Sequence, residues 1–401
     1  MIYNQEQEEI INGAVNHVKY GGWHSNQIYQ ISGKPGTGKT EVLMEIIRRI
    51  GIPLNRVAPM AYVGQAASVM RTRGLINAKT IHSWLYKLVE VELKDELGKP
   101  IIDEVFNKPK LVLRFIPVDL TDIDYIIVDE ASTVPMKMRR DIERQGLPII
   151  AVGDLNQLPP VKDKPAFLID GEVHYLTQIM RQHKDSGIVY LSELVLNDKP
   201  ISCGLYGKDA LVIEEKDLND EMLRNAFIVL CGTNKTRDKL NKKIRNELYG
   251  IYNDVPQHGE KIICRKNNWA LEIDGISLTN GLIGTVTSYP NVEQFDGEKF
   301  YIDFKPDLIP SYYPHLGCNY KYFNGNYDQR MLIKSTPYTQ GELFEPANAI
   351  TTHLSQGGQY PNGVYIQEYL NRDIQKHLNY TGITRFSKYL IYVIPNKKIF
   401  I

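Results

Sequence analysis

Apolar residues along the chain fall into short continuous runs and into helical spacings, and the two patterns alternate. A β-prone run at 28–32 leads into a glycine-rich segment, and a helical pattern then runs from 40 to 49 and stops at Gly51. Its apolar side chains share one face: Val42, Leu43, Ile46, Ile47 and Ile50. Further runs typical of buried strands lie at 125–128, 147–152, 227–231, 363–366 and 390–394. Strands separated by helices predict parallel α/β layers.

One long segment departs from this alternation. Residues 260–345 are rich in Gly, Asn, Tyr and Pro, with short β-prone pieces at 284–289 and 299–304. No convincing amphipathic helix pattern is visible there. The composition predicts a small all-β insertion in the second α/β domain.

A second insertion is expected at 87–118. Residues 88–94 alternate apolar and charged side chains, with Val89, Val91 and Leu93 on one face, which suits a half-buried hairpin. A turn-like stretch follows, and we expect 101–106 to return as the second strand.

Length and composition narrow the class of protein. The 401 residues exceed one compact core, so about two to four domains are expected. No apolar run approaches the roughly 20 residues that span a bilayer. The polar, acidic N-terminal segment does not resemble a signal peptide, and we expect a cytoplasmic protein that does not associate with membranes.

The cysteines and the net charge exclude few further classes of protein. The four cysteines are scattered, so they predict neither a metal site nor a disulfide framework, and we expect small buried or partly buried residues: Cys203, Cys231, Cys264 and Cys318. Basic and acidic residues balance at 47 each, which argues against a repressor-like DNA-binding protein with a basic surplus. A local basic groove with stacking aromatics can still hold a single strand.

The segment 33–40 reads G-K-P-G-T-G-K-T and fits the phosphate-loop pattern G-x-x-x-x-G-K-[ST] at every position. Such a loop cradles phosphates with backbone N–H groups and with the positive end of the following helix. Lys39 is expected to reach the outer phosphates, and the Thr40 hydroxyl to bind Mg²⁺. The residues expected to bind ATP here are Gly33, Gly36, Thr37, Gly38, Lys39 and Thr40.

The strand expected at 125–128 is followed by two carboxylates, Asp129 and Glu130. Asp129 would hold Mg²⁺, while Glu130 would orient and deprotonate the attacking water. The non-catalytic alternative is that the two carboxylates lie at a solvated strand end or cap a helix. The phosphate loop upstream favours the catalytic interpretation.

Beyond these two motifs, the chain resembles the RecD/Dda branch of superfamily 1 (1B) helicases nearly end to end. Residues 153–161, GDLNQLPPV, resemble motif III, in which Gln157 would sense the γ-phosphate. Residues 176–182, LTQIMRQ, resemble motif IV, whose Arg181 would contact the γ-phosphate from the second domain. Residues 380–385, YTGITR, resemble motif VI and imply that Arg385 is an arginine finger.

The resemblance also implies an adenine-reading glutamine near the N-terminus. Residues 4–10 read NQEQEEI, and the spacing favours Gln7, with Gln5 as the alternative.

Three further segments resemble DNA-contacting motifs: 62–67 (YVGQAA, motif Ia), 80–84 (TIHSW, motif Ib) and 350–357 (ITTHLSQG, motif V). They imply phosphate contacts that do not read sequence. The implied contact residues are Gly64, Gln65, Thr80, His82, Thr352 and His353. Trp269, at the entry to the insertion, could stack on a base or equally pack between domains.

Two motifs depart from the family pattern. Leu354 stands where motif V usually has Lys, and Val63 and Gln65 stand where motif Ia usually reads T-G-K-A-A. Each replacement removes a polar or cationic phosphate partner, so we expect weaker and less salt-dependent DNA binding.

The resemblance implies an α/β fold of two RecA-like P-loop domains, with ATP and Mg²⁺ in the cleft between them. The first would span 1–175 with the hairpin insertion at 87–118. The second would span 176–262 and 346–401, interrupted by an SH3-like β insertion at 263–345.

The implied function is an ATP-dependent DNA helicase or translocase acting on single-stranded DNA and at junctions with duplex. The branch implies 5′→3′ movement and a role in replication, recombination or repair, with proteins of those pathways as partners. The compact size resembles phage-encoded members acting in a bacterial cytoplasm, and a monomer is favoured. Two alternatives stay open: a translocase that strips proteins from DNA or acts on RNA, and a non-hydrolysing nucleotide-gated binding module.

In the resembling helicases, the hairpin after motif Ib separates the strands. Leu97 and Phe106 are the apolar residues expected to form such a wedge here. The acidic face of the hairpin leaves a purely structural role as an alternative, because carboxylates repel phosphate.

Overall fold

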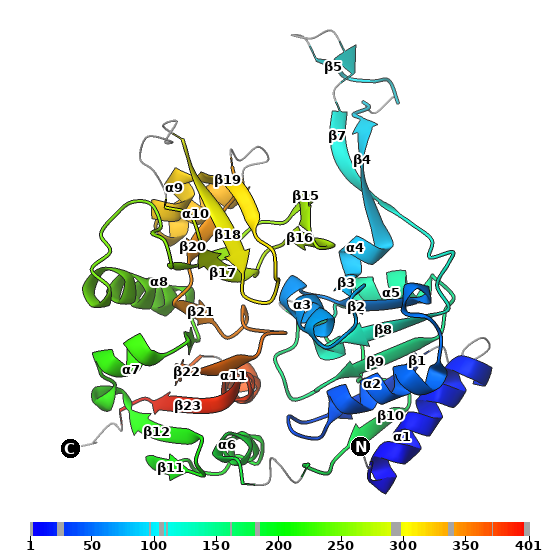
Figure 1. The fold of residues 1–401 in the computed structure, drawn as a ribbon, viewed down its shortest axis with the longest axis horizontal. Helices are drawn as coiled ribbons and strands as arrows, with labels where there is room; N and C mark the ends of the chain where they lie inside the picture. Colours follow the sequence, from blue (N-terminus) through cyan, green and yellow to red (C-terminus); the bar gives the residue numbers. More distant parts are fainter. Residues whose placement is uncertain are drawn as a thin grey trace.

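The structure is a computed structural model that describes residues 3–21, 28–95, 98–103, 108–109, 111–160, 163–180, 185–289, 298–335, 341–370 and 372–396. Two α/β domains lie side by side, and each carries an insertion above its sheet (Figure 1). Within the described residues, no helix combines the length and the apolar composition that crossing a bilayer requires.

The first domain is built on a parallel sheet of six described strands. In spatial order these are β10 (Val173–Leu176), β1 (Ile28–Gly33), β9 (Ile149–Gly153), β8 (Tyr125–Asp129), β2 (Val57–Ala61) and β3 (Lys79–Thr80). Its α-helices are α1 (Gln5–Asn16), α2 (Lys39–Ile50), α3 (Gly64–Thr72), α4 (Ile81–Leu85) and α5 (Met136–Glu143). The expected helix at 40–49 and the strand at 125–128 are confirmed.

Helices cover both faces of this sheet, so every residue of β1 is buried. One face packs Ile31, Ile127 and Val152 against the apolar stripe of α2. The other face packs Ile126 and Val128 of β8, together with residues of the neighbouring strands β2 and β9, against α4 and α5. The same layered packing therefore buries both the apolar stripe of α2 and the continuous apolar runs of the strands.

The second domain repeats the plan with the strand order β11 (Gly204–Tyr206), β12 (Ala210–Glu214), β23 (Phe386–Ile394), β22 (Tyr360–Ile366), β13 (Ile228–Cys231) and β21 (Ala349–Thr351). Described pairs are parallel except the β11–β12 hairpin. Its helices are α6 (Gly187–Leu196), α7 (Asp220–Asn225), α8 (Asn234–Lys242) and α11 (Arg372–Thr384).

Residues 261–346 form the β insertion, which rests on the second domain (Figure 1). Its antiparallel sheet contains β19 (Tyr313–Asn319), β18 (Lys299–Pro306), β17 (Ile283–Val286), β14 (Lys261–Cys264) and β20 (Phe344–Pro346), with a separate hairpin of β15 (Asn268–Ile273) and β16 (Ile276–Leu278). The expectation of no helix is wrong, because α9 (Tyr320–Asn324) and α10 (Tyr327–Ser335) lie within it. α10 buries no residue, so it leaves no amphipathic pattern to detect.

The hairpin of the first domain (residues 86–117) projects far from the sheet (Figure 1). Its long strands are β4 (Tyr86–Glu92) and β7 (Leu111–Pro117), and a small pair, β5 (Ile102–Asp103) and β6 (Lys108–Pro109), lies at its tip. The expected return at 101–106 is confirmed only where it begins, since the Ile101 amide donates to Leu93 O at 2.7 Å and Lys94 bridges Pro100. The long partner of β4 is β7, which comes after the second pair at the tip. The alternation is confirmed, since Val89 and Val91 are partly buried while Glu90 and Glu92 are exposed. Leu97 and Phe106 lie outside the described residues.

The cysteine expectation holds for three positions and fails at one. Cys231, Cys264 and Cys318 are buried, whereas Cys203 is exposed. Cys203 directly precedes the edge strand β11.

Candidate nucleotide and nucleic-acid site

The glycine-rich loop joins the end of β1 to the start of α2. Gly36 and Gly38 have φ values of 80° and 82°, which side chains other than glycine rarely adopt. A Cβ at Gly38 would also lie 2.9 Å from Gln7 Nε2. No side chain caps the amino end of α2, so its first N–H groups and its positive dipole end are left to an anion.

Lys39 and Thr37 hold the loop in shape. The Lys39 ammonium donates to the carbonyl oxygens of Gly33 at 2.6 Å and Lys34 at 3.2 Å. The Thr37 hydroxyl donates to Lys34 O at 2.8 Å. The lysine is therefore already inside the loop that would cradle the phosphates.

The structure brings Gln7, rather than Gln5, to this loop. Gln7 is buried, and its amide nitrogen donates to Thr37 O at 3.3 Å and lies 3.2 Å from Met180 Sδ. Gln5 is exposed, and its side chain donates to Glu9 of its own helix at 2.9 Å. The capping box of α1 fixes Gln7 because Asn4 accepts from its amide and donates to its side chain.

Two carboxylates follow β8 beneath the loop. The amide of Glu130 donates to Asp129 Oδ1 at 2.9 Å. Burial first, and then the charge of Glu130, raise the pKa of Asp129 to about 6. Glu130 adopts a left-handed conformation with φ 50°, a strained geometry that clusters at functional sites.

Arg385, between α11 and β23, reaches this pair from the second domain. Its Nη1 atom lies 3.8 Å from Glu130 Oε1 and donates to Gly358 O at 3.1 Å. Its side chain is 6% exposed. A strand end and an arginine separated by 255 residues therefore meet at one point.

A cavity of about 260 Å³ lies between the two domains at this point. Its lining includes Gly38, Lys39 and Thr40 of the loop, together with Glu130 and Arg385. Three buried polar atoms of lining residues have no hydrogen-bond partner in the described part of the chain: Glu130 Oε2, Gln157 Oε1 and Arg385 Nε. Buried polar atoms are normally satisfied, so these fit a ligand that completes the site.

The residues fit a magnesium nucleotide. The Thr40 hydroxyl and the Asp129 carboxylate are oxygen ligands of the kind that Mg²⁺ prefers. The loop amides and Lys39 suit a polyphosphate, and Gln7 lies where a base could be read. Arg181, the other arginine expected here, lies outside the described residues.

Arg73 was missed by the sequence interpretation. It follows α3, and its Nη1 donates to the Thr40 hydroxyl at 2.7 Å. Its charge also opposes the rise in the pKa of Asp129 that burial causes. A single arginine after a short helix carries no sequence signal, so only the fold reveals this contact.

Residues 154–158 form several hydrogen bonds with the second domain. The Leu158 amide donates to Thr381 Oγ1 at 2.8 Å, and Gln356 Nε2 donates to Leu158 O at 2.7 Å. The Tyr380 hydroxyl donates to the buried Asp154 at 2.6 Å. A shift at Gln157 would therefore be felt directly in the second domain.

The expected nucleic-acid residues divide into three groups. His82 lies in an aromatic cluster, with its ring centroid 5.6 Å from Tyr86, 6.2 Å from Phe115 and 5.9 Å from Trp269. Burial first, and then the charge of Lys137, lower the pKa of His82. The cluster joins α4, the hairpin and the β insertion. Trp269 therefore packs between domains in this structure.

Thr80, Gln65 and Gly64 make structural contacts. The Thr80 hydroxyl caps α4 by accepting from the Ser83 amide at 3.2 Å. Gln65 is buried and donates to the Tyr360 hydroxyl at 3.2 Å. A Cβ at Gly64 would lie 2.1 Å from Thr279 Oγ1 of the insertion. The motif Ia segment thus faces the second domain and the insertion.

Motif V packs beside β13. Thr352 is fully buried, and its amide and hydroxyl donate to Cys231 O at 2.9 Å and 3.2 Å. His353 is partly exposed, and burial lowers its pKa. Of this pair, only His353 is accessible to a ligand.

Comparisons with known proteins agree with this geometry. The family described as AAA domain matches residues 3–216, which include the loop and both carboxylates. An uncharacterized protein of Methanocaldococcus jannaschii is 25% identical over 98% of this chain, which spans 39% of that protein's length. The RecBCD enzyme subunit RecD of Buchnera aphidicola subsp. Schizaphis graminum is 26% identical, covering 94% of this chain and 71% of RecD.

Solved structures show the same fold. The crystal structure of the Pif1 helicase from Bacteroides in complex with ADP-AlF3 and single-stranded DNA superposes with a TM-score of 0.57 and 17% identity. The match covers 98% of this chain and 92% of that one. The mixed α/β architecture with parallel central sheets is therefore shared with that structure.

Proposed function

Because this chain belongs to the AAA domain family, we propose that it is an ATP-hydrolysing DNA helicase that moves on single-stranded DNA. One observation carries the proposal: Arg385 of the second domain lies 3.8 Å from Glu130 of the first, in the cavity beside the phosphate loop. A binding module that only reads ATP needs neither group. An enzyme that couples hydrolysis to domain movement needs both.

The residues divide the chemistry between the domains. Lys39 and the loop amides would bind the outer phosphates, and Thr40 and Asp129 would hold the metal ion. Mg²⁺, when bound, neutralises phosphate charge. Glu130 orients the attacking water and takes its proton, while Arg385 stabilises charge on the transferred phosphoryl group.

Coupling follows from the contacts of residues 153–161. Gln157 lines the cavity, and the neighbouring Leu158 is bonded to both Thr381 and Gln356. Loss of the γ-phosphate changes the cavity around Gln157 and Arg385 together. The hydrogen bonds of Leu158 transmit this change to the second domain, which then moves with respect to the first. This movement is what a motor on a strand requires.

The substrate assignment rests on similarity. RecD and Pif1 are the named relatives, and the Pif1 structure contains single-stranded DNA. The strand would pass over His82, Trp269 and His353. Membership of the RecD/Dda branch, 5′→3′ movement, action as a monomer in replication, recombination or repair, and a phage origin follow from the resemblance of the motifs.

Steady-state ATPase with and without single-stranded DNA or RNA, combined with strand displacement on a forked duplex, tests the proposal. DNA-stimulated turnover with displacement supports it. DNA-stimulated turnover without displacement identifies the translocase that only strips proteins. Stimulation by RNA alone would reassign the substrate, and tight ATP binding without turnover would leave the nucleotide-gated module.

A further inference from the structure

One arginine reaches the nucleotide cavity from outside the motifs recognised in the sequence. Arg73 directly follows α3, is exposed to solvent, and lines the cavity together with Thr40 and Asp129. Its Nη1 atom donates to the Thr40 hydroxyl oxygen at 2.7 Å. The oxygen that would bind Mg²⁺ is therefore bonded to a cation of the chain itself.

The fold determines where Arg73 lies. α3 ends just before it, and Gly74 then turns the chain with a φ of 104°, in the region that favours glycine. The Leu75 amide donates back to Met70 O at 3.2 Å, and both of these side chains are buried in the core that also contains the apolar stripe of α2. The end of α3 is thereby held against the helix that carries Thr40, while the arginine side chain itself stays in solvent.

The charge of Arg73 also acts on the second expected metal ligand. Burial is the main cause that raises the pKa of Asp129, and of the two cations that oppose this rise, Arg73 acts more strongly than Lys39. Lys39 donates to the loop carbonyl oxygens of Gly33 and Lys34. Lys39 therefore serves the phosphate loop, whereas Arg73 acts on the pair of metal ligands.

A guanidinium group and a divalent cation compete for these ligands. The Thr40 oxygen accepts from Arg73 with a lone pair, and a metal ion would need a lone pair of the same atom. Two cations on one oxygen atom also repel each other at a range that salt screens little. The contact of Arg73 with Thr40 and the binding of a metal ion at Thr40 therefore oppose each other.

We propose that Arg73 competes with Mg²⁺ for Thr40 and Asp129, and that this competition weakens the binding of the magnesium nucleotide. The inference rests on the nucleotide site of the proposed function and adds to it a residue outside the motifs. Arg73 leaves the Thr40 hydroxyl when the magnesium nucleotide binds, and it returns as the magnesium product departs. A motor must release its product in every cycle, and release limits the rate of many enzymes. A competitor built into the chain favours that release.

The test compares the affinity for ADP with and without the metal. A fluorescent ADP that carries a methylanthraniloyl group is titrated into the full chain in excess MgCl₂ and, separately, in EDTA. The ratio of the dissociation constant in EDTA to that in MgCl₂ measures how much the metal adds to binding. Arg73→Gln should raise this ratio severalfold, because the competitor is gone. Its affinity in EDTA should not increase, since ADP is an anion and loses a nearby positive charge.

Two further variants control for charge and position. Arg73→Lys keeps a cation at the same position, so its ratio should lie between those of the parent and Arg73→Gln. Arg140→Gln removes an equal charge from an exposed position on α5 and should leave the ratio unchanged. Damage to the phosphate loop would weaken binding with and without the metal, so it could not imitate a rise in the ratio.

Three outcomes overturn the inference. An equal loss of affinity in MgCl₂ and in EDTA would make Arg73 a ligand of the nucleotide phosphates instead of a competitor of the metal. Unchanged affinities under both conditions would show that the contact with Thr40 does not affect binding. In both cases the parent still binds and hydrolyses ATP, so the proposed function stands. Absence of nucleotide binding by the parent would defeat the proposed function and this competition with it.

Discussion

Two helices begin directly after a strand at the carboxyl edge of a parallel sheet, and they treat their amino ends differently. In the first domain, α2 begins after Gly38 with no side-chain cap. In the second domain, the Thr233 hydroxyl caps α8, and the Glu368 carboxylate accepts from the amides of Gly232 at 2.6 Å and Thr233 at 2.9 Å. The positive end of one helix is left open for a ligand, and the other is filled by the protein itself.

The difference assigns separate tasks to two domains of the same plan. The open end of α2 makes the first domain the nucleotide-binding one. The filled end of α8 makes that helix a rigid part of the second domain, which contributes Arg385 to the shared cavity instead. Similar sheets therefore do different chemistry because of a few residues at the strand ends.

Removing the contribution of the second domain should have the largest effect. Arg385→Ala should lower DNA-stimulated ATP turnover about 10³-fold or more, as is typical for loss of an arginine finger. Nucleotide affinity should change little, because the phosphate loop stays intact. Steady-state ATPase and titration with a fluorescent ATP analogue measure both, with Arg224→Ala as control. Parental turnover in Arg385→Ala would place catalysis entirely in the first domain.

Within the first domain, binding and chemistry should separate. Glu130→Gln keeps Asp129 and should bind ATP yet hydrolyse it at least about 10²-fold more slowly, since a positioned base is lost. Lys39→Ala should lose affinity and turnover together. The same two assays apply, and near-normal turnover by Glu130→Gln would assign the base elsewhere.

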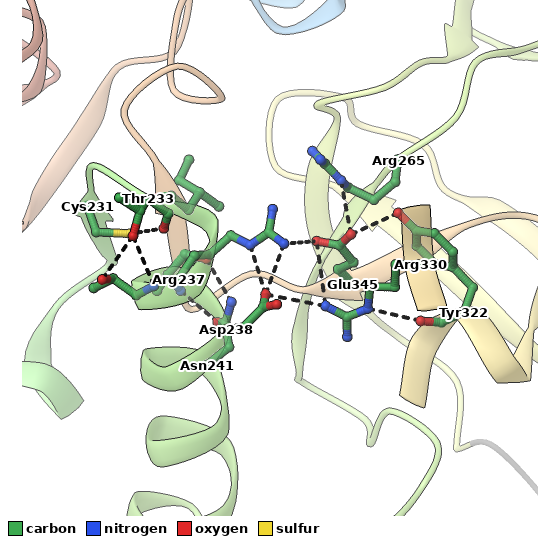
Figure 2. A network of polar contacts seen from close by, with 12 residues as sticks. Cys231, Thr233, Arg237, Asp238, Asn241, Arg265, Tyr322, Arg330 and Glu345 are labelled. Atoms are coloured by element: carbon green, nitrogen blue, oxygen red, sulfur yellow. Dashed lines mark hydrogen bonds and ion pairs between the residues drawn. The ribbon is translucent and has the colours of Figure 1, made fainter. Parts of the chain in front are cut away.

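The buried Glu345 carboxylate, on β20 of the β insertion, serves stability (Figure 2). In this network of charged side chains, its oxygens lie 3.1 Å, 3.3 Å and 3.9 Å from three guanidinium nitrogens: Arg237 Nη2, Arg265 Nε and Arg330 Nη1. Glu345→Gln leaves these three guanidinium groups with one carboxylate, that of Asp238, and breaking such a buried pair costs about 3–5 kcal/mol of unfolding free energy. Urea denaturation measures this loss, with the exposed Glu215→Gln as control. A loss no larger than that of the control would show that the network adds nothing to stability.

The same network predicts a pH dependence. Burial alone would raise the pKa of Glu345, but the neighbouring guanidinium groups, Arg265 first, hold it below its ordinary value. A lowered pKa means that the stabilisation is present at neutral pH and is lost as the solution is acidified through the folded-state pKa. Glu345→Gln should therefore show a shallower acid limb in stability than the parent.

The insertions of the two domains also differ: the hairpin projects from the first domain, whereas the β insertion packs on the second (Figure 1). Replacing residues 94–109 by a short turn keeps the β4–β7 pairing and the Phe115–Trp269 contact. If the tip separates strands, DNA-stimulated ATPase survives while unwinding of a forked duplex falls severalfold. Unwinding at the parental rate would make the hairpin structural and direct attention to the β insertion.

The smallest effect should come from the filled helix end itself. Glu368→Gln weakens the cap of α8, and loss of a helix cap costs about 1 kcal/mol. It should create no second nucleotide site, because the segment 231–236, CGTNKT, lacks the G-x-x-x-x-G-K-[ST] pattern of the phosphate loop. Thermal unfolding and nucleotide stoichiometry measure the two effects. A second bound nucleotide would show that the Glu368 carboxylate alone prevents the second domain from binding a nucleotide.

Local patterns in the sequence determined the phosphate loop, the helix after it, the carboxylates at the end of β8 and the alternating strand of the hairpin. Each depends on spacing within about ten residues, where backbone geometry and burial act directly. The sequence did not predict α10 because this helix buries no residue, and it did not predict α9 because a helix of five residues is too short to show a period. The long return strand was misplaced because pairing partners are chosen by tertiary packing.

Tertiary structure alone decided the contacts between distant segments. It brought Arg385 to Glu130 and Arg73 to Thr40, and it turned Gln65 toward Tyr360 instead of toward an open groove. These polar side chains follow no periodic pattern, because their partners lie on other elements. The cost of removing them from water is offset only when the folded chain brings those partners together. The residue types could therefore be recognised in the sequence, whereas their pairing required the fold.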